Sequence, residues 1–180
     1  MAIRMADVKD LPRILEIYGP YVKNTAVSFE YTVPTLAEFT QRFLKITARF
    51  PWLVWEEDGE VLGYAYGGLP WERAAYQWVA SASIYLCPKA HGKGIGRKLY
   101  KKLEQLLQKQ GYRKVYAVIT TDNEASVAFH KAVGYRHTAT MPNCGYKFGK
   151  WYGTIWMEKD LNTWDTPPSE PVTIQEILEG

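Results

Sequence analysis

One stretch, residues 88–98, constrains the fold more than any other part of the chain; it reads Pro-Lys-Ala-His-Gly-Lys-Gly-Ile-Gly-Arg-Lys. Residues 81–87 before it have the composition of a strand, and apolar residues after it recur at the spacing of one helix face. These apolar residues are Ile95, Leu99, Leu103, Leu106 and Leu107. The stretch is therefore predicted to be a turn that leads from a strand into a helix starting near Gly94.

The glycines of this turn, Gly92, Gly94 and Gly96, favour the binding of an anion. Alternating glycines let backbone N–H groups point together, and the helix that follows adds the positive end of its dipole. Three cations strengthen the charge: Lys93, Arg97 and Lys98. A bare Gly-x-Gly is more often an ordinary bend. Here its position between strand and helix, and the charge around it, favour a binding turn.

Two common nucleotide motifs are excluded for this turn. A Walker loop requires Gly-x-x-x-x-Gly-Lys-Ser/Thr, which does not occur in the chain. The dinucleotide pattern Gly-x-Gly-x-x-Gly fails because Arg97 and Leu99 occupy the two positions open to its third glycine. Neither of these two motifs is therefore expected at this turn.

Composition limits the class of protein. With 180 residues, 47% of them hydrophobic and 14% aromatic, the chain can bury one good core and is predicted to form one domain. The net charge of +3 comes from scattered Lys and Arg, apart from the turn, so no nucleic-acid surface is expected. No apolar run approaches about 18 residues, and the N-terminus lacks a signal-peptide core. We therefore expect a cytoplasmic protein without a membrane partner.

The two cysteines, Cys87 and Cys144, have neither CxxC nor Cys/His ligand spacing. A disulfide framework and a zinc site are therefore not expected, and no other metal is expected either. Cys87 is predicted to be a buried thiol at the end of a strand.

The remaining pattern predicts an α/β chain. Before the glycine-rich turn we expect a strand at 3–5, a helix over 8–22 capped by Asp7 or Asp10, and a second helix after the capping box at Thr35. A hairpin of 52–57 and 61–67 around Asp58 and Gly59 and a strand at 78–87 follow. After the turn we expect its helix, ending at Gly111, a strand at 114–120, a helix at 124–132 capped by Asn123, and strands at 135–141 and 151–158 flanking 144–149. Residues 1–161 are predicted to form the domain. The proline-containing tail, 162–180, is expected to lie on the surface and to end in a short helix at 173–178.

The turn resembles the acetyl-CoA loop of the GNAT superfamily of N-acetyltransferases, whose pattern is Gln/Arg-x-x-Gly-x-Gly/Ala between a strand and a long helix. His91 stands where that pattern has Gln or Arg. The predicted order β-α-α-β-β-β-α-β-α-β-β is also that of the GNAT fold, which implies a mixed, mostly antiparallel, twisted central sheet flanked by helices. The resemblance covers about residues 2–160.

Within that superfamily, the chain is similar to the group of phosphinothricin N-acetyltransferases and L-amino acid N-acyltransferases, which acetylate small amino acids and analogues such as methionine sulfone. Four segments carry this similarity: 51–54, 75–78, 126–135 and 145–151. The group is commonly homodimeric. The resemblance therefore implies a homodimer that transfers an acetyl group from acetyl-CoA to a small-molecule amine, in a ternary complex.

The resemblance also implies which residues bind CoA. The pyrophosphate is expected on the amides of residues 92–97, with Lys93, Arg97 and Lys98 near the phosphates. The strand before the turn is expected to pair its backbone with the pantetheine through Ile84, Tyr85 and Leu86. Asn123 matches a family asparagine that contacts CoA, although a helix N-cap is an equally good explanation of an asparagine there.

The reaction requires a route for protons, and here the chain departs from the family. By resemblance, His130 is expected to protonate the departing thiolate. The family places a glutamate base where this chain has Ser81, in Trp78-Val79-Ala80-Ser81. A serine cannot take a proton from an ammonium, so Ser81 is expected to hold a water or the amine, unless it is only a small strand residue. Glu30, Glu72 or a water chain remain open as substitutes, and an amine of low pKa needs no strong base.

The acceptor pocket is expected to use five residues: Phe29, Glu30, Arg73, Tyr76 and Tyr85. Arg73 can hold a carboxylate in a bidentate pair, or simply face solvent. Trp71 and Trp151 are expected in the core or at a dimer interface.

Two other functions stay open. A CoA-binding module with weak or lost catalysis would keep the turn and tolerate Ser81 and His91. An acetyltransferase for another amine, such as an aminoglycoside, a polyamine or a protein N-terminus, is the second. A polyamine requires an acidic pocket, whereas Arg73 favours an anionic acceptor.

Overall fold

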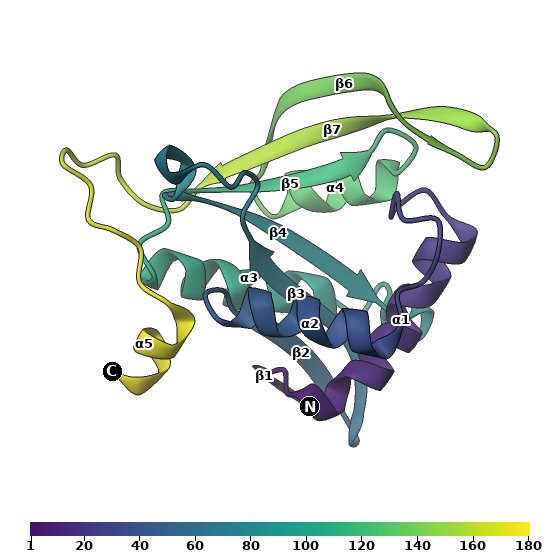
Figure 1. The fold of residues 1–180 in the computed structure, drawn as a ribbon, viewed down its shortest axis with the longest axis horizontal. Coiled ribbons are helices and arrows are strands. Elements are labelled where there is room, and N and C mark those ends of the chain that lie inside the picture. Colours follow the sequence, from purple (N-terminus) through teal and green to yellow (C-terminus); the bar gives the residue numbers. More distant parts are fainter.

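A seven-stranded sheet in the order β1-β2-β3-β4-β5-β7-β6 runs through the computed structural model of the chain, which describes residues 1–180 (Figure 1). All neighbouring strands are antiparallel except β4 and β5, which are parallel. The strands are β1 Ala2–Met5, β2 Trp52–Glu57, β3 Glu60–Gly68, β4 Val79–Leu86, β5 Lys114–Thr120, β6 Arg136–Lys147 and β7 Lys150–Asp160. The predicted mixed, mostly antiparallel sheet is confirmed.

Helices cover both faces of this sheet (Figure 1). They are α1 Leu11–Asn24, α2 Leu36–Thr47, α3 Ile95–Lys109, α4 Glu124–Ala132 and α5 Ile174–Glu179, with short 3-10 turns at Val8–Asp10, Ala74–Tyr76 and Pro88–Ala90. Side chains of β4 alternate between the two layers: Tyr85 packs on Tyr18 and Tyr21 of α1, whereas the side chain of Ile84 faces Gly96 of α3. Alternation along a single strand thus assigns α1 to one face and α3 to the other.

Local sequence signals explain most element boundaries. At the start of α2, the hydroxyl of Thr35 accepts from the Glu38 amide, and the carboxylate of Glu38 accepts from the Thr35 amide. This is the expected capping box. Asp58 and Gly59 adopt φ values of 52° and 77° in the β2–β3 turn, as a tight hairpin requires. Asn123 caps α4 as predicted.

The strand β6 extends further than predicted. The residues expected to connect the last two strands, 144–149, contribute their first four to β6, and only Phe148 and Gly149 form the turn. The pairing of β6 with β7 shifts register twice, between His137 and Ala139 and between Met141 and Gly145. Each shift breaks the alternation of apolar and polar residues, so the sequence pattern ends before the strand does.

The C-terminal tail ends in the predicted short helix but does more than cover the surface. Ile174 is 1% exposed and belongs to the core. The side-chain amide of Gln110, which follows α3, donates to the carbonyls of Arg49 and Val172. These bonds tie the tail to the ends of α3 and α2. Residues 162–180 therefore contribute to the packing of the domain.

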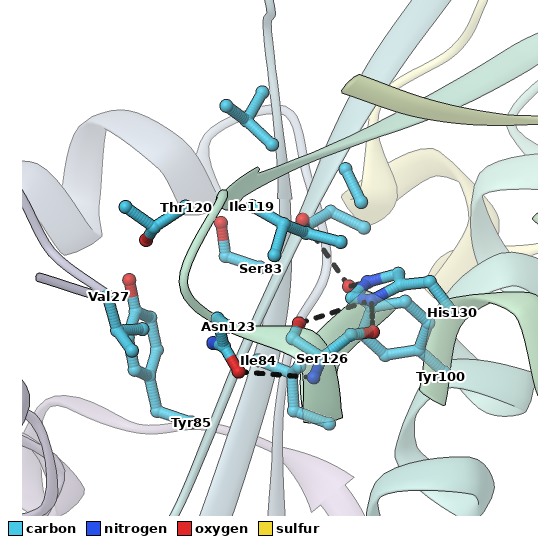
Figure 2. A pocket seen from close by; sticks show the side chains of 13 residues that line it. Val27, Ser83, Ile84, Tyr85, Tyr100, Ile119, Thr120, Asn123, Ser126 and His130 are labelled. Carbon is cyan, nitrogen blue, oxygen red and sulfur yellow. Dashed lines mark hydrogen bonds between the residues drawn. The ribbon is translucent and has the colours of Figure 1, made fainter. Parts of the chain in front are cut away.

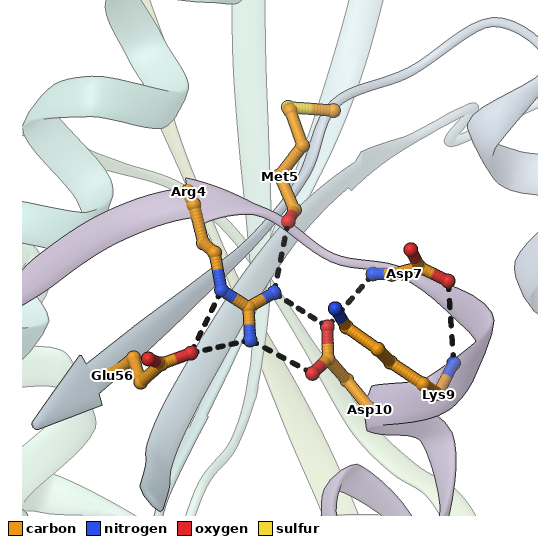
Figure 3. A network of polar contacts seen from close by, with 6 residues as sticks. All are labelled: Arg4, Met5, Asp7, Lys9, Asp10 and Glu56. Carbon is orange, nitrogen blue, oxygen red and sulfur yellow. Dashed lines mark hydrogen bonds and ion pairs between the residues drawn. The ribbon is translucent and has the colours of Figure 1, made fainter. Parts of the chain in front are cut away.

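An ion cluster joins β1, β2 and the start of α1 at the sheet edge remote from β5 (Figure 3). The guanidinium of Arg4 donates twice to the carboxylate of Asp10, at 2.7 and 2.8 Å, and also contacts Glu56. Asp10 is 7% exposed, and the Arg4 guanidinium holds the pKa of this carboxyl below its usual value.

None of the helices is both long and apolar enough to cross a membrane.

Candidate active site

The sheet is split between β4 and β5. The two strands pair only at their beginnings, from Val79 opposite Lys114 to Ser81 opposite Tyr116. Beyond Ser81, β4 stays paired with β3 while β5 follows β7, so one edge of β4 has no strand partner. Backbone groups of a free strand edge are ready to bind an extended ligand. We call this opening the notch.

The notch encloses about 60 Å³ and is lined by residues of β4, β5, α3, α4 and the α1–α2 connection (Figure 2). Its polar lining consists of Ser83, Tyr85, Tyr100, Thr120, Asn123, Ser126 and His130. Ile84 lies in this lining, as does Val27. Predicted site residues from three separate segments, Tyr85, Asn123 and His130, are thus brought together.

The glycine-rich turn begins just beyond the end of β4. Gly92 and Gly94 have φ values of 74° and 73°, and a Cβ at either position would meet no atom within 4 Å. Glycine is therefore required there by backbone conformation rather than by packing. Gly96 differs, because a Cβ on it would lie 3.3 Å from Phe129 and 3.4 Å from Ile84.

The cations of the turn are not equivalent. Lys93 and Arg97 are exposed and form no ion pair, so their charge is available to an anion on the turn. The ammonium of Lys98 instead lies 5.2 Å from the ring centre of Trp55. The exposed ring of His91 has its Nε2 3.4 Å from the hydroxyl of Tyr21.

Leu86, the last residue of β4, has a backbone group already in use. The hydroxyl of Tyr21 donates to its carbonyl at 2.5 Å.

The side chain of Tyr85 packs against Tyr18 and Tyr64, and burial raises the pKa of its hydroxyl well above the ordinary value. Tyr85 is therefore neutral and can offer the notch a hydrogen bond.

His130 is 3% exposed, and its ring nitrogens contact the carbonyl and the hydroxyl of Ser126 and the hydroxyl of Tyr100 (Figure 2). Its Nδ1 donates to the carbonyl of Ser126 at 2.7 Å, which leaves Nε2 to accept from the hydroxyl of Tyr100 at 2.9 Å. Burial lowers the pKa of His130, although the bond to Ser126 opposes this shift. The imidazole is thus neutral, and its Nε2 carries no proton.

Asn123 was expected either to cap α4 or to contact CoA, and its position suits both roles. Its Oδ1 accepts from the amide of Ser126 at 3.1 Å, so it is the N-cap of α4. It also lines the notch, where its Nδ2 donates to no protein atom. One side chain can therefore cap the helix and still donate into the notch.

A second cavity, of about 390 Å³, opens between α2, β3, β4 and residues 68–72. We call it the α2-side cavity. Its lining consists of Arg42, Lys45, Ile46, Phe50, Tyr66, Gly68, Leu69, Glu72, Ser81 and Ser83. Ser83 lines this cavity and the notch alike. The two spaces therefore share one wall residue, Ser83, in the middle of β4.

The two candidate carboxylates differ in their surroundings. Glu30 accepts two hydrogen bonds from Arg42, at 2.6 and 2.9 Å, and one from the hydroxyl of Tyr18 at 2.7 Å. The Arg42 guanidinium lowers the pKa of Glu30, so this carboxylate is a poor proton acceptor. Glu72 is exposed and lines the α2-side cavity together with Ser81.

Other predicted acceptor residues do not line either cavity. The ring of Phe29 covers Gly145, where a Cβ would lie 2.3 Å from it. Arg73 is exposed at the start of the 3-10 turn Ala74–Tyr76, and the ring of Tyr76 lies 4.8 Å from that of Trp71 at a tilt of 40°. Neither Trp71 nor Trp151 belongs to the core, since they are 38% and 61% exposed.

Sequence reasoning missed Tyr100 and Ser83. Tyr100 is fully buried on α3, at a position that helical spacing assigns to packing, and nothing in the sequence places its hydroxyl against His130. Ser83 did have a signal, because it lies two residues from Ser81 and so on the same face of the strand.

A glycine-rich turn at a helix N-terminus, preceded by a strand with a free edge, is suited to an extended ligand that carries an anionic group. Residues 3–156 match the family described as "Acetyltransferase (GNAT) domain". The chain belongs to the GNAT acetyltransferase family, which confirms the resemblance predicted from the turn and from the order of elements.

Proteins of known name or structure agree with this membership. The chain is 34% identical over 173 residues to a phosphinothricin N-acetyltransferase of Streptomyces viridochromogenes, covering 95% of this chain and 94% of that protein. It is 36% identical over 171 residues to an L-methionine sulfoximine/L-methionine sulfone acetyltransferase of Salmonella typhimurium, covering 93% and 98%. A phosphinothricin acetyltransferase of Sinorhizobium meliloti, solved with AcCoA, superposes with a TM-score of 0.90 at 38% identity, covering 95% and 94%.

Proposed function

We propose that the chain transfers an acetyl group from acetyl-CoA to the amine of a small amino acid or a close analogue, by direct attack in a ternary complex. The observation that carries this function is that the notch and the α2-side cavity share Ser83 in their linings. A thioester entering along β4 and an amine entering from the α2 side converge there. Holding two reactants in such proximity is a large part of catalysis.

CoA fits the groups on its path. The amides of residues 92–97, with Lys93 and Arg97, receive the pyrophosphate, and the free edge of β4 at Ile84–Leu86 pairs with the pantetheine. Asn123 donates from Nδ2 toward the same ligand. A backbone amide of β4 and the hydroxyl of Tyr85 are the donors available to the oxygen that becomes negative during attack.

The thiolate receives its proton through Tyr100 and His130 acting as one unit. Because Nε2 is unprotonated at rest, His130 must first take up a proton. The imidazolium then gives this proton to the oxygen of Tyr100 while Tyr100 gives its own to the sulfur, and His130 returns to the neutral form. The lowered pKa of His130 makes its imidazolium a stronger acid for this step.

The amine loses its proton without a buried carboxylate. The floor of the α2-side cavity offers hydroxyls from Ser81, Ser83 and Tyr66, none of which takes a proton from an ammonium. A water held by these hydroxyls, with Glu72 at the exposed side, carries the proton to solvent. Such a site favours amines that already lose their proton near neutral pH.

The acceptor class follows from the charge and size of the cavity. About 390 Å³ suits a small amino acid, and Lys45, which forms no ion pair, lies on the lining where a carboxylate can reach it. Arg42 is already neutralised by Glu30. The names of the relatives, which act on phosphinothricin and methionine sulfone or sulfoximine, support the same class.

We further propose that the chain is a cytoplasmic homodimer. Exposed aromatic side chains on the last two strands support association: Tyr146 is 49% exposed and Trp151 is 61% exposed. They lie on the β6–β7 hairpin at the edge of the sheet (Figure 1). Such a surface is typical of an interface.

The test is thiol release from acetyl-CoA with a panel of amines, alongside a calorimetric titration with CoA. The panel contains methionine sulfone, methionine sulfoximine, phosphinothricin, a polyamine and an aminoglycoside. Rapid release with one of the first three supports the proposal. Tight CoA binding without release for any amine, from about pH 7 to about pH 9, where more amine is neutral, identifies a CoA-binding module instead.

A further inference from the structure

The ammonium of Lys147, at the end of β6, is buried without a carboxylate partner. The residue is 3% exposed, and Nζ donates to the carbonyls of Val22, Thr25 and Ser28 at 2.7, 2.8 and 2.6 Å. Burial lowers the pKa of Lys147 from the usual lysine value. Burying a charge is costly unless each of its donors is satisfied, and these three carbonyls satisfy all three donors.

The three carbonyls belong to the end of α1 and to the segment that follows it. Val22 lies in the last turn of α1, and Thr25 is the C-cap residue. The final carbonyls of a helix lack partners within the helix and form the negative end of its dipole. Lys147 supplies the missing cation from more than a hundred residues away in the sequence.

The β6–β7 hairpin holds this segment at other points as well. The hydroxyl of Tyr31 donates to the carbonyl of Tyr146 at 2.6 Å. The ring of Phe29 lies so close over Gly145 that no larger residue fits there without moving the ring. The connection from 25 to 31 has local bonds of its own, from the amides of Val27 and Glu30 to the hydroxyls of Thr25 and Ser28, and the hairpin adds its contacts to these.

The same connection lines the notch and holds a residue that lines the α2-side cavity. Val27 and Asn123 both line the notch (Figure 2). The carbonyl of Ala26, the residue before Val27, accepts a hydrogen bond from the hydroxyl of Thr120. Glu30, at the other end, holds the guanidinium of Arg42, which lines the α2-side cavity. A shift of residues 25–30 thus alters the two spaces together.

We propose that Lys147 is a positioning residue for acetyl transfer: it fixes residues 25–30 so that the notch and the α2-side cavity keep their alignment at Ser83. This inference rests on the function proposed above. Lys147 lines neither space, so it acts through the segment it holds. Without its ammonium, three carbonyls lose their donor, and the segment moves to reach water.

The test is Lys147→Met, which keeps the apolar stem and removes every donor. At saturating acetyl-CoA, kcat/KM for the acceptor is expected to fall roughly 10- to 100-fold, as for other displacements of about 1 Å near a reacting pair. The Kd for CoA is expected to change much less than kcat/KM, because the pyrophosphate is assigned to the glycine-rich turn, outside residues 25–30. Amide hydrogen exchange is expected to rise in residues 25–31 and to stay unchanged in β3 and β4.

Lys150→Met is the matched control. Lys150 lies in the same hairpin but is exposed, and it pairs with Asp122 at 2.7 Å. Its loss is expected to change kcat/KM less than about twofold. Tyr31→Phe, which removes an exposed anchor of the same segment, is expected to reproduce the effect of Lys147→Met in weaker form, and it carries the test if Lys147→Met does not fold.

Three results overturn the proposal. One is wild-type kcat/KM with wild-type exchange in Lys147→Met. The second is exchange that rises equally in all strands, which indicates a role in global stability alone. The third is an unfolded Lys147→Met beside a Tyr31→Phe protein with wild-type kcat/KM. Failure of the proposed function is distinct from all three, because the wild-type protein then releases no thiol with any amine.

Discussion

Gly94→Ala tests the glycine-rich turn with a cost that the structure defines. Gly94 has a φ of 73°, and a Cβ there meets nothing within 4 Å, so the added methyl causes backbone strain and no clash. For an L-residue this conformation costs roughly 1–2 kcal/mol. Gly59, in the β2–β3 turn, is a matched control, because its φ is 77° and its Cβ position is equally open.

The two turns are expected to respond differently to the same strain. Paired strands on both sides hold Gly59 in place, so Gly59→Ala keeps its φ, and Tm falls by roughly 2–8 °C for a chain of this size. Gly94 has no such constraint on its N-terminal side, so the turn of Gly94→Ala relaxes in the free protein and must be restored when CoA binds. Its Kd for CoA is then expected to rise about 5- to 30-fold, with a smaller loss of Tm.

The assay is calorimetric titration with CoA, combined with thermal unfolding of both variants and the wild type. Wild-type affinity together with wild-type Tm in Gly94→Ala would refute the reasoning, since the strain has to appear in one of the two. Weaker CoA binding by Gly59→Ala, equal to that of Gly94→Ala, would instead show that the turn is not where CoA binds.

Three further predictions concern protons. His130→Phe and Tyr100→Phe are each expected to lower kcat about 100-fold, with CoA affinity unchanged, and the double variant is expected to be no slower than either single variant; an additive loss contradicts a shared relay. Ser81→Glu places a carboxylate on the floor of the α2-side cavity and is expected to raise kcat/KM at pH 7 by about tenfold or more, extending activity to lower pH; an unchanged pH profile means that deprotonation of the amine does not limit the rate. Asp10→Asn is expected to lower the free energy of unfolding by about 1–3 kcal/mol at pH 7. Because the folded pKa of this carboxyl is lowered, its stabilisation is complete above about pH 4 and is lost as pH falls through the folded value, so urea unfolding of wild type and variant should converge in acid.

Much of the fold could be predicted because its signals are local. The capping box of Thr35, the Asp58–Gly59 turn and the five apolar residues of α3 each depend on a few neighbouring residues, and the structure confirms all three. The end of β6 depends on register against another strand. No local pattern encodes that register, and the prediction of this strand was therefore too short.

The candidate site divides in the same way. The glycine-rich turn is local and was predicted, whereas the pairing of Tyr100 with His130 joins two helices across the notch. Lys147 has the sequence appearance of a surface lysine in a hairpin, and only tertiary contact shows that its ammonium is buried against α1. Residues whose role depends on a partner far along the chain stay invisible to spacing arguments.

The absence of a buried carboxylate at Ser81 also limits which amines can react well. Without a base, the rate follows the fraction of amine that is already neutral. A peptide α-amine has a pKa of about 8 and a lysine side chain one of about 10.4, so at pH 7 their neutral fractions differ by a factor of roughly 200. Hydroxyls from Ser81, Ser83 and Tyr66 can orient a neutral amine but cannot reduce this difference. Such a cavity favours α-amines of lower pKa because a larger fraction of them is neutral, whatever their shape. A glutamate in place of Ser81 would accept the proton and remove that preference.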